Sequence, residues 1–488
     1  MDTILNGGFV KGGVYLLLGP PGTGKTIFAN QMCFHHAKMK SGNIVYVTLL
    51  AESHGRMMEN LRPLEYFEDK DISDSIHYMG GYHVLEKDGL KGFLRLIAGI
   101  VKEKNASILM IDGMSTIGEL EQSAITFRKF AHELNSYLSS SGCTAFLLSS
   151  MEGHLSKPEH TMVDGIISFH YENDDSRVTR KIEVRKFRGS AHYYGKHFYS
   201  INDSGIIIYP KIESIPQTHE CPIKRRDRLP FKIDGLDEML KGGVYSNTIT
   251  SLIGAAGTGK TTLALQFLAA GAEEGQNGIF FGLYEKPEEL MDKSEELSLD
   301  FHKWVKKKRI DVIWHPQLEL ELDQLSTSLI ETVKRTKAKR IVIDGIDGLK
   351  LSSSSPERLF RFMTALTLEL KKLGATILII EEVSTFGTYE GRQIAELSAI
   401  NEVVIYLHQD TTGDEIFNAL SVLKMRNSAF DKRTKKLVID DKGLAVKNIL
   451  ETPELMIEKT SGPFKSEKKV NKKVVKKVIK KTSSKSRK

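Results

Sequence analysis

The chain has 488 residues, 40% hydrophobic and 27% charged, a globular composition that excludes a largely disordered protein. Its three cysteines form no CxxC pair, which excludes a disulfide framework and a cysteine-based zinc site and suits a reducing, cytoplasmic environment. No apolar run reaches the ~18–20 residues of a membrane helix, and no cleavable signal peptide fits the N-terminus, so no membrane partner is expected.

The net charge of +7 is unevenly distributed. Residues 461–488 hold eleven lysines and one arginine against one glutamate, a net charge of +11, so the rest of the chain carries −4. Repulsion among these lysines predicts a disordered, Lys-rich tail over residues 456–488. The tail is interpreted either as a site of attraction to nucleic acid or an acidic partner, or as a solubilising extension.

Short apolar runs without alternation predict strands buried on both faces, and amphipathic stretches between them predict helices. The strands expected in the first half are 14–18, 44–49, 108–111 and 144–148, with a helix over 26–40. Those expected in the second half are 248–253, 279–283, 340–343 and 376–380, with a helix over 261–274. This order predicts an α/β fold, a mostly parallel sheet flanked by helices in each half.

Several segments of the first half recur in the second. The matches are GGVY at 12–15 and 242–245, GTGKT at 22–26 and 257–261, an Ile-Asp-Gly at 111–113 and 343–345, and K-x-R at 186–188 and 424–426. From GTGKT onward the offset drifts only between 232 and 238 residues, which indicates a tandem duplication. We therefore expect domains over 1–212 and 229–455, joined by a linker over 213–228.

The motif GxxxxGK[ST] occurs twice, at 19–26 and 254–261, each time between a predicted strand and a predicted helix. In this motif backbone N–H groups surround phosphate oxygens, the lysine reaches the β- and γ-phosphates and the hydroxyl ligates Mg²⁺. The alternative, a glycine-rich turn with an incidental lysine, does not explain two matches in repeat register. The residues expected to bind ATP are Gly22, Thr23, Gly24, Lys25, Thr26, Gly257, Thr258, Gly259, Lys260, Thr261 and Thr262.

Carboxylates follow two other strands of each half. Asp112 and Asp344 end apolar strands, and with Thr26 and Thr261 they are the predicted Mg²⁺ ligands; a turn-initiating Asp-Gly is the alternative. Hydrolysis also needs a carboxylate to orient or deprotonate water, and Glu285 and Glu52 are the candidates. A solvated loop glutamate is the alternative for both.

Two halves with these motifs and a K-x-R strand resemble the KaiC family of RecA-like ATPases over residues 1 to about 450. The resemblance implies two tandem RecA-like P-loop NTPase domains and an ATP-dependent homohexamer, a double ring with ATP between subunits. It also implies that Lys186, Arg188, Lys424 and Arg426 reach the phosphates of a neighbouring subunit, as arginine fingers do. The alternative is a strand edge with ordinary solvated charges.

The sequence departs from the family pattern in three places. Two adjacent glutamates are replaced by Glu285-Lys286 and Ala51-Glu52, which predicts weaker hydrolysis, most of all in the first half. The family's phosphorylated Ser-Thr pair is Ser398-Ala399 here, so Ser398 is the single candidate phosphosite, with a helix-surface hydroxyl as the alternative. The strap that resembles residues 233–243 has only a short counterpart after Met1, so an upstream start or a partly missing strap is expected.

Three functions fit these residues. The leading hypothesis is a KaiC-like ATPase with serine autokinase activity in signalling or timing, which would have a protein signalling partner. The first alternative is a RecA/RadA-type DNA-dependent ATPase, which the basic tail favours and the acidic body does not. The second is a nucleotide-gated scaffold with little catalysis, which the missing carboxylates favour.

Overall fold

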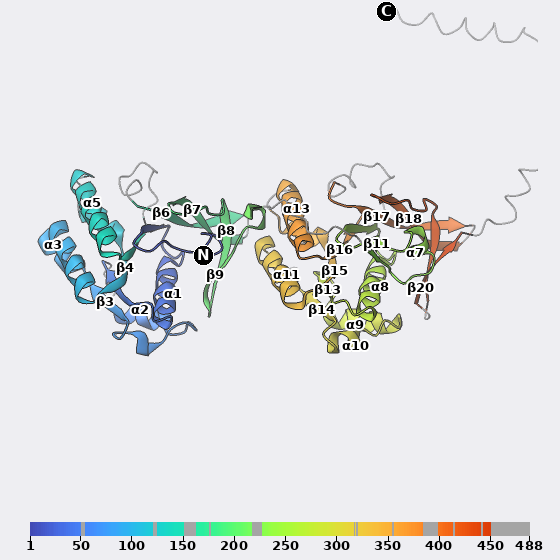
Figure 1. Ribbon diagram of the computed structural model, residues 1–488, viewed down its shortest axis with the longest axis horizontal. Coiled ribbons are helices and arrows are strands. Elements are labelled where there is room, and N and C mark those ends of the chain that lie inside the picture. Colours follow the sequence, from blue (N-terminus) through green and yellow to red (C-terminus); the bar gives the residue numbers. More distant parts are fainter. Residues whose placement is uncertain are drawn as a thin grey trace, which may run out of the picture.

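A computed structural model describes residues 1–49, 54–120, 124–150, 163–174, 177–216, 227–316, 318, 321–353, 356–383, 399–412, 415–440 and 443–449. Within these ranges each half of the chain contains one nine-stranded sheet, and the two halves lie side by side (Figure 1). The strand order is β3-β2-β4-β5-β1-β6-β7-β8-β9 in the first half and β14-β13-β15-β16-β12-β17-β18-β19-β20 in the second, the same topology twice. This identity confirms the tandem repeat.

The first sheet is parallel from β3 to β6 and antiparallel from β6 to β9. Its strands β1, β2, β4 and β5 coincide with the predicted apolar runs to within two residues and are buried. The strands are β1 Val14–Leu18, β2 Asn43–Thr48, β3 Ile76–Gly80, β4 Ala106–Asp112, β5 Thr144–Ser149, β6 Gly165–Asp174, β7 Arg177–Phe187, β8 Lys196–Asn202 and β9 Gly205–Tyr209.

Helices cover both faces of this sheet, and each face has its own apolar core. Helix α1 packs over one face with an aromatic-rich cluster, whereas α3 and α5 pack together over the other. The described helices are α1 Lys25–Lys38, α2 His54–Leu61, α3 Tyr82–Glu103, α4 Met114–Leu120 and α5 Ala124–Ser141, with 3₁₀ turns η1 Asp69–Asp71 and η2 Ile212–Ser214. The predicted α/β class is confirmed.

The second sheet repeats this arrangement, with α8 on one face and α11 and α13 on the other. The strands are β12 Ile249–Gly254, β13 Gly278–Gly282, β14 Ile310–Trp314, β15 Arg340–Asp344, β16 Thr376–Glu382, β17 Val403–Thr412, β18 Glu415–Met425, β19 Lys435–Asp440 and β20 Gly443–Asn448. The helices are α7 Leu236–Met239, α8 Lys260–Glu273, α9 Pro287–Glu296, α10 Phe301–Lys306, α11 Leu322–Thr336, α12 Ile346–Leu351 and α13 Pro356–Lys372.

The GGVY match is wrong as an alignment. Val14 opens the central strand β1, but Val244 belongs to β11 (Val244–Tyr245), which pairs with β10 (Arg228–Leu229) in a separate two-stranded sheet. Backbone hydrogen bonds give the true register. The bonds Leu5 N to Met1 O, Asn6 N to Thr3 O and Gly7 N to Asp2 O recur 235 residues later, from positions 240, 241 and 242. Met1 is therefore the counterpart of Leu236.

Ion pairs join the two halves. Arg177, at the end of the β6–β7 hairpin, donates to Glu321 at 3.2 Å, and Arg358 of α13 lies 3.3 Å from Glu213 of η2. Arg358 also binds both oxygens of Asp323 at 2.9 Å. Burial raises the pKa of Asp323 to about 6, although Arg358 opposes that shift. The contact between the halves thus contains a buried charge network.

Candidate nucleotide-binding sites

The first GxxxxGK[ST] motif forms a loop between β1 and α1. Gly24 ends the loop with φ 91°, a left-handed conformation that favours glycine. The Lys25 Nζ donates to the carbonyl oxygens of Gly19 at 2.6 Å and Pro20 at 2.9 Å, so the loop encloses the ammonium group. The Thr26 hydroxyl donates to Asp112 Oδ2 at 2.9 Å. The fold therefore brings the lysine, the hydroxyl and the carboxylate of the first half together.

The second motif has the same geometry between β12 and α8. The Lys260 Nζ donates to Ala255 O at 2.6 Å, and the Thr261 hydroxyl donates to Asp344 Oδ2 at 3.2 Å. Beside this loop is a cavity of about 430 Å³. The predicted residues that line it are Gly257, Gly259, Lys260, Thr261, Thr262, Glu285 and Asp344. Thr258 is buried behind the loop, where its hydroxyl donates to Ala255 O at 2.8 Å.

Glu285 lines this cavity, and its two carboxylate oxygens differ in their contacts. Its Oε1 accepts from Lys293 Nζ at 2.7 Å, and its buried Oε2 has no hydrogen-bond partner among the described residues. Burial, reinforced by the charge of Glu285, raises the pKa of Asp344 to about 6 against the opposing effects of Thr261 and Lys260. Two interacting carboxylates, one of which has a buried oxygen with no partner among the described residues, are a favourable environment for a cation.

The raised pKa of Asp344 makes the stability of the unliganded protein depend on pH. Because the folded state holds this proton more tightly than the unfolded chain, the contribution of Asp344 to wild-type stability falls as pH rises from about 4 to about 6. The side chain introduced by Asp344→Asn does not ionise, so the variant does not lose stability through this residue as pH rises. Denaturant titrations without nucleotide give the free energy of unfolding of the variant minus that of the wild type. We expect this difference to be about 1 kcal/mol more favourable to the variant at pH 8 than at pH 5. A difference between variant and wild type that is the same at both pH values would contradict the raised pKa of Asp344.

The two sites differ in the residues around the aspartate. The Tyr46 hydroxyl donates to Asp112 Oδ2 at 2.9 Å, and the counterpart of Tyr46 on β13 is Phe280, which has no hydroxyl. Burial and the charge of Asp112 raise the pKa of Tyr46 well above its ordinary value, so it acts as a neutral donor. Tyr46 was not predicted from the sequence, although its alignment with a phenylalanine in the repeat was a usable signal.

Backbone register also relates the candidate bases. Leu49 N donates to Asp112 O at 2.8 Å, and Leu283 N donates to Asp344 O at 3.1 Å, so the position equivalent to Glu285 is 51, an alanine. Glu52 itself lies outside the described residues. Lys293, in the second turn of α9, was not predicted from the sequence either, because no motif marks it.

Two tyrosines hold the first loop from the antiparallel part of the sheet. The Tyr171 hydroxyl of β6 donates to Gly22 O, and the Tyr199 hydroxyl of β8 donates to Thr23 O at 2.6 Å. Nothing in the sequence distinguished them from other aromatic residues of these strands. They link the conformation of the nucleotide loop to the sheet that carries the K-x-R segment.

The K-x-R residues occupy matching places in the two halves. Lys186 lies in β7 and Lys424 in β18, both partly buried, and each is followed two residues later by an exposed arginine, Arg188 or Arg426. Burial and the adjacent arginine lower the pKa of both lysines. Neither Lys424 nor Arg426 is among the described residues that line the cavity of the second site. Ser398 and the Lys-rich tail lie outside the described residues.

Two P-loops on RecA-like sheets, each with a strand-end aspartate beside the loop threonine, define the tandem P-loop ATPase class. A family model described as "ATPase: KaiC" matches residues 1–213 and 229–451. The chain belongs to this KaiC ATPase family.

Curated relatives agree with the family. The chain is 24% identical to the circadian clock oscillator protein KaiC of a Picosynechococcus species, over 94% of this chain and 90% of the relative. It is 26% identical to the circadian clock protein KaiC3 of a Synechocystis species, over 91% and 90%, and 24% identical to the KaiC of Synechococcus elongatus, over 93% and 89%. The expected resemblance is confirmed. Among the described residues no helix is long and apolar enough to span a membrane.

Proposed function

We propose that this protein hydrolyses ATP at two sites per chain, each completed by a neighbouring subunit within a homohexameric double ring. The observation that carries the proposal is the placement of the K-x-R cations. Lys424 and Arg426 are outside the described lining of their own P-loop cavity, and Arg426 is exposed. Cations of this kind act on the γ-phosphoryl group, so a neighbouring chain must bring its nucleotide to them. The proposal extends to Lys186 and Arg188.

Mg²⁺ would be held by Thr26 with Asp112 in the first site and by Thr261 with Asp344 in the second. Each pair already places two oxygens within 3.2 Å or less of each other, and Glu285 offers a buried oxygen without a partner. Bound there, the ion would neutralise charge on the β- and γ-phosphates. Asp344 must be ionised to serve, which its raised pKa permits at neutral pH.

Side chains of the protein bind the phosphates and activate the water. Lys25 and Lys260 leave the loop carbonyl oxygens, to which they now donate, for phosphate oxygens. Glu285 orients the attacking water and accepts its proton, and Lys293 holds this carboxylate in place. In the first site Ala51 offers no such group, and Tyr46 shares the charge of Asp112. We infer slower hydrolysis in the first half.

The test is release of inorganic phosphate from Mg·ATP with and without single- and double-stranded DNA. Turnover that DNA leaves unchanged supports the proposed ATPase. Stimulation severalfold or more would favour the RecA/RadA-type alternative, which the shared fold and the Lys-rich tail favour. Tight ATP binding without turnover in either condition would leave the nucleotide-gated scaffold.

Autophosphorylation is a further part of the proposal, and Ser398 is its site. Ser398 precedes the Lys424–Arg426 segment, so the neighbouring nucleotide that this segment meets would also approach the serine, with Glu285 as the base. Because Ala399 cannot accept phosphate, incubation with Mg·ATP should give one phosphorylated species in mass spectrometry. Phosphate confined to the tail hydroxyls, or none, would leave an ATPase without kinase activity.

The output of such a ring would be signalling or timing, by analogy with the relatives named above. A protein partner would read the nucleotide state of the ring, and the tail would attract an acidic partner or nucleic acid through its net charge of +11.

A further inference from the structure

The two P-loops differ in the charge of the residues around them. Carboxylates line the cavity beside the second P-loop at four places, and these are Glu285, Asp344, Asp347 and Glu382. The residues at the matching places of the first half are Ala51, Asp112, Ser115 and Ser150. At these four places the aspartate that ends the central strand is therefore the only carboxylate that both halves share.

Strand register shows that Ser150 and Glu382 occupy the same place. The residue that precedes the P-loop lies beside Ser149 in the first half and beside Glu381 in the second, and Ser150 and Glu382 come next in the chain. In the first half the Ser150 hydroxyl donates to Ser115 Oγ at 3.0 Å. A hydrogen-bonded pair of neutral hydroxyl groups is therefore compatible with this fold, and the acidic pair of the second half is not required for folding.

Asp347 matches Ser115, because each follows the strand-end aspartate of its half by three residues. Asp347 lies in the first turn of α12 and pairs with Lys350 at 2.7 Å. Both side chains of this pair are substantially exposed, so water screens their interaction and Lys350 cancels the charge of Asp347 only in part. Glu382 is also exposed where it lines the cavity. Both carboxylates thus face the solvent that a nucleotide would displace.

The charges of these carboxylates act on the ammonium group of Lys260. Burial lowers the pKa of Lys260, and Glu382 opposes that shift most strongly, ahead of Asp344 and Asp347. In the P-loop motif this lysine reaches the β- and γ-phosphates of the nucleotide. A carboxylate that attracts the ammonium group from this position must repel phosphate groups bound beside it.

A bound Mg²⁺ changes the balance of this repulsion. The ion bridges β- and γ-oxygens and cancels part of their negative charge. Repulsion by Glu382 and Asp347 therefore weakens the binding of a metal-free nucleotide more than the binding of its Mg²⁺ complex. The neutral hydroxyl groups of Ser150 and Ser115 exert no such repulsion in the first half.

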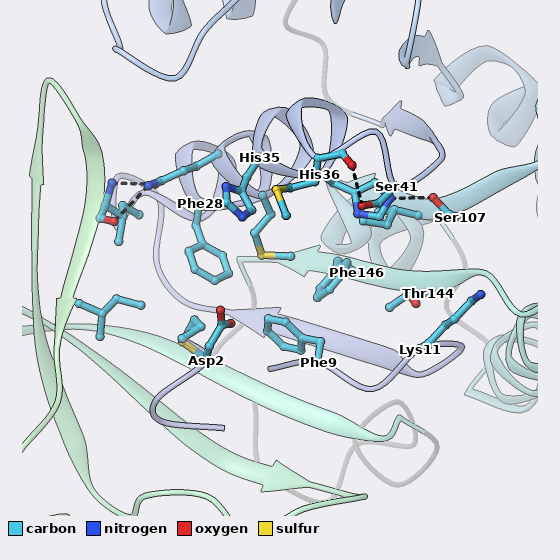
Figure 2. Close-up of a pocket in the computed structure, with 17 residues that line it drawn as sticks. Asp2, Phe9, Lys11, Phe28, His35, His36, Ser41, Ser107, Thr144 and Phe146 are labelled. Carbon is cyan, nitrogen blue, oxygen red and sulfur yellow. Dashed lines mark hydrogen bonds between the residues drawn. The ribbon is translucent and has the colours of Figure 1, made fainter. Parts of the chain in front are cut away.

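A larger cavity in the first half is separate from this comparison. It encloses about 740 Å³ between α1 and the N-terminal segment, and Figure 2 shows the Asp2 carboxylate at one end of it. None of the P-loop residues 19–26 is among its described lining. Asp2 therefore belongs to a different cavity and does not replace the carboxylates that the first P-loop lacks.

We propose that Glu382 and Asp347 make the second site selective for the Mg²⁺ complex of its nucleotide, whereas the first site also accepts the metal-free form. The inference rests on the proposed binding of ATP at both P-loops and adds two specificity-determining residues to it. They act by repelling phosphate groups that carry no metal. No motif in the sequence marks either residue.

The first test compares the two sites in the full-length protein. Lys25→Ala leaves the second P-loop intact and Lys260→Ala leaves the first, and each variant is titrated with fluorescent ADP, which avoids turnover. The readout is the ratio of Kd in excess EDTA to Kd in excess Mg²⁺. We expect this ratio to be at least about tenfold larger for the second site than for the first. Equal ratios, or a larger ratio for the first site, would overturn the proposal.

The second test removes the charges within one site, so no other difference between the halves enters it. In the Lys25→Ala background, Glu382→Gln combined with Asp347→Asn should lower the ratio about tenfold, mainly through tighter binding in EDTA. The control is Glu415→Gln, which removes an exposed carboxylate outside the described lining of the cavity and should leave the ratio unchanged. An unchanged ratio in the double variant would contradict the assignment.

The reciprocal change and the outcomes that separate this inference from the proposed function complete the design. In the Lys260→Ala background, Ser150→Glu should raise the ratio severalfold. If the double variant loses turnover while its ratio stays as before, Glu382 has a catalytic role and the selectivity proposal is wrong, although ATP hydrolysis at this site stands. If Lys25→Ala binds no nucleotide even in Mg²⁺, the proposed ATP binding at the second P-loop is wrong, and this inference with it.

Discussion

Lys260→Ala should remove most of the ATPase activity, and Lys25→Ala should remove the smaller part. Each lysine is the positive charge that its loop encloses, and its loss leaves the β- and γ-phosphates without their main protein cation. The asymmetry arises from the second carboxylate. Glu285 faces the cavity of the second site, whereas the equivalent position in the first site is Ala51.

We expect steady-state phosphate release to fall at least tenfold in Lys260→Ala and less than twofold in Lys25→Ala, since loss of a general base commonly costs about 10²–10⁴ in rate. Both variants should keep the wild-type melting profile without nucleotide. Ala51→Glu is the complementary variant, and it should raise the activity that Lys260→Ala leaves. If Lys25→Ala proves the more damaging change, the carboxylate argument is wrong.

The second large effect is complementation between two variants whose second-half sites are impaired in different ways. Arg426→Ala should bind nucleotide normally but turn it over slowly, because its own P-loop is intact and its neighbour's phosphates lose a cation. Mixed one to one with Lys260→Ala, it should regain about a quarter of wild-type activity in the second half. In randomly mixed rings half of the second-half P-loops are intact, and half of these lie beside a neighbour with an intact Arg426. One quarter of the sites therefore have both residues.

Arg433→Ala is the control for complementation. Arg433 is exposed like Arg426, but its guanidinium pairs with Asp431 of its own chain at 2.8 Å. Its loss should leave turnover near wild type, so it offers no defect to complement. Activity of the Arg426→Ala and Lys260→Ala mixture that merely equals the average of the separate variants would show that each chain completes its own site.

The fold was predictable because its central strands are short, wholly apolar and repeated. Val14–Leu18 is β1 to the residue, and both P-loops follow directly from a motif with fixed spacing. The antiparallel extension β6–β9 was predicted only at its K-x-R strand, since its strands alternate partly exposed residues and carry no other motif. The false GGVY alignment shows why short identities mislead. Only the pattern of backbone hydrogen bonds showed that Met1 is equivalent to Leu236 in the repeat.

The site residues were predictable only where a motif with fixed spacing determines the role of each residue. The loop lysines, hydroxyls and strand-end aspartates lie together because parallel strands end at one edge of a sheet. Tyr46, Tyr171 and Lys293 come from segments whose approach to the loops depends on packing, which the sequence alone did not reveal.

The mass of the assembly shows whether a neighbouring chain completes each ATP site. Light scattering on a size-exclusion column should be run on the wild-type protein without nucleotide and in saturating Mg·ATP, with Arg426→Ala alongside. We expect monomers or loose oligomers without nucleotide and a hexamer of about six chain masses with it. A monomer that persists in saturating Mg·ATP, while still binding and hydrolysing it, would show that each chain completes its own sites.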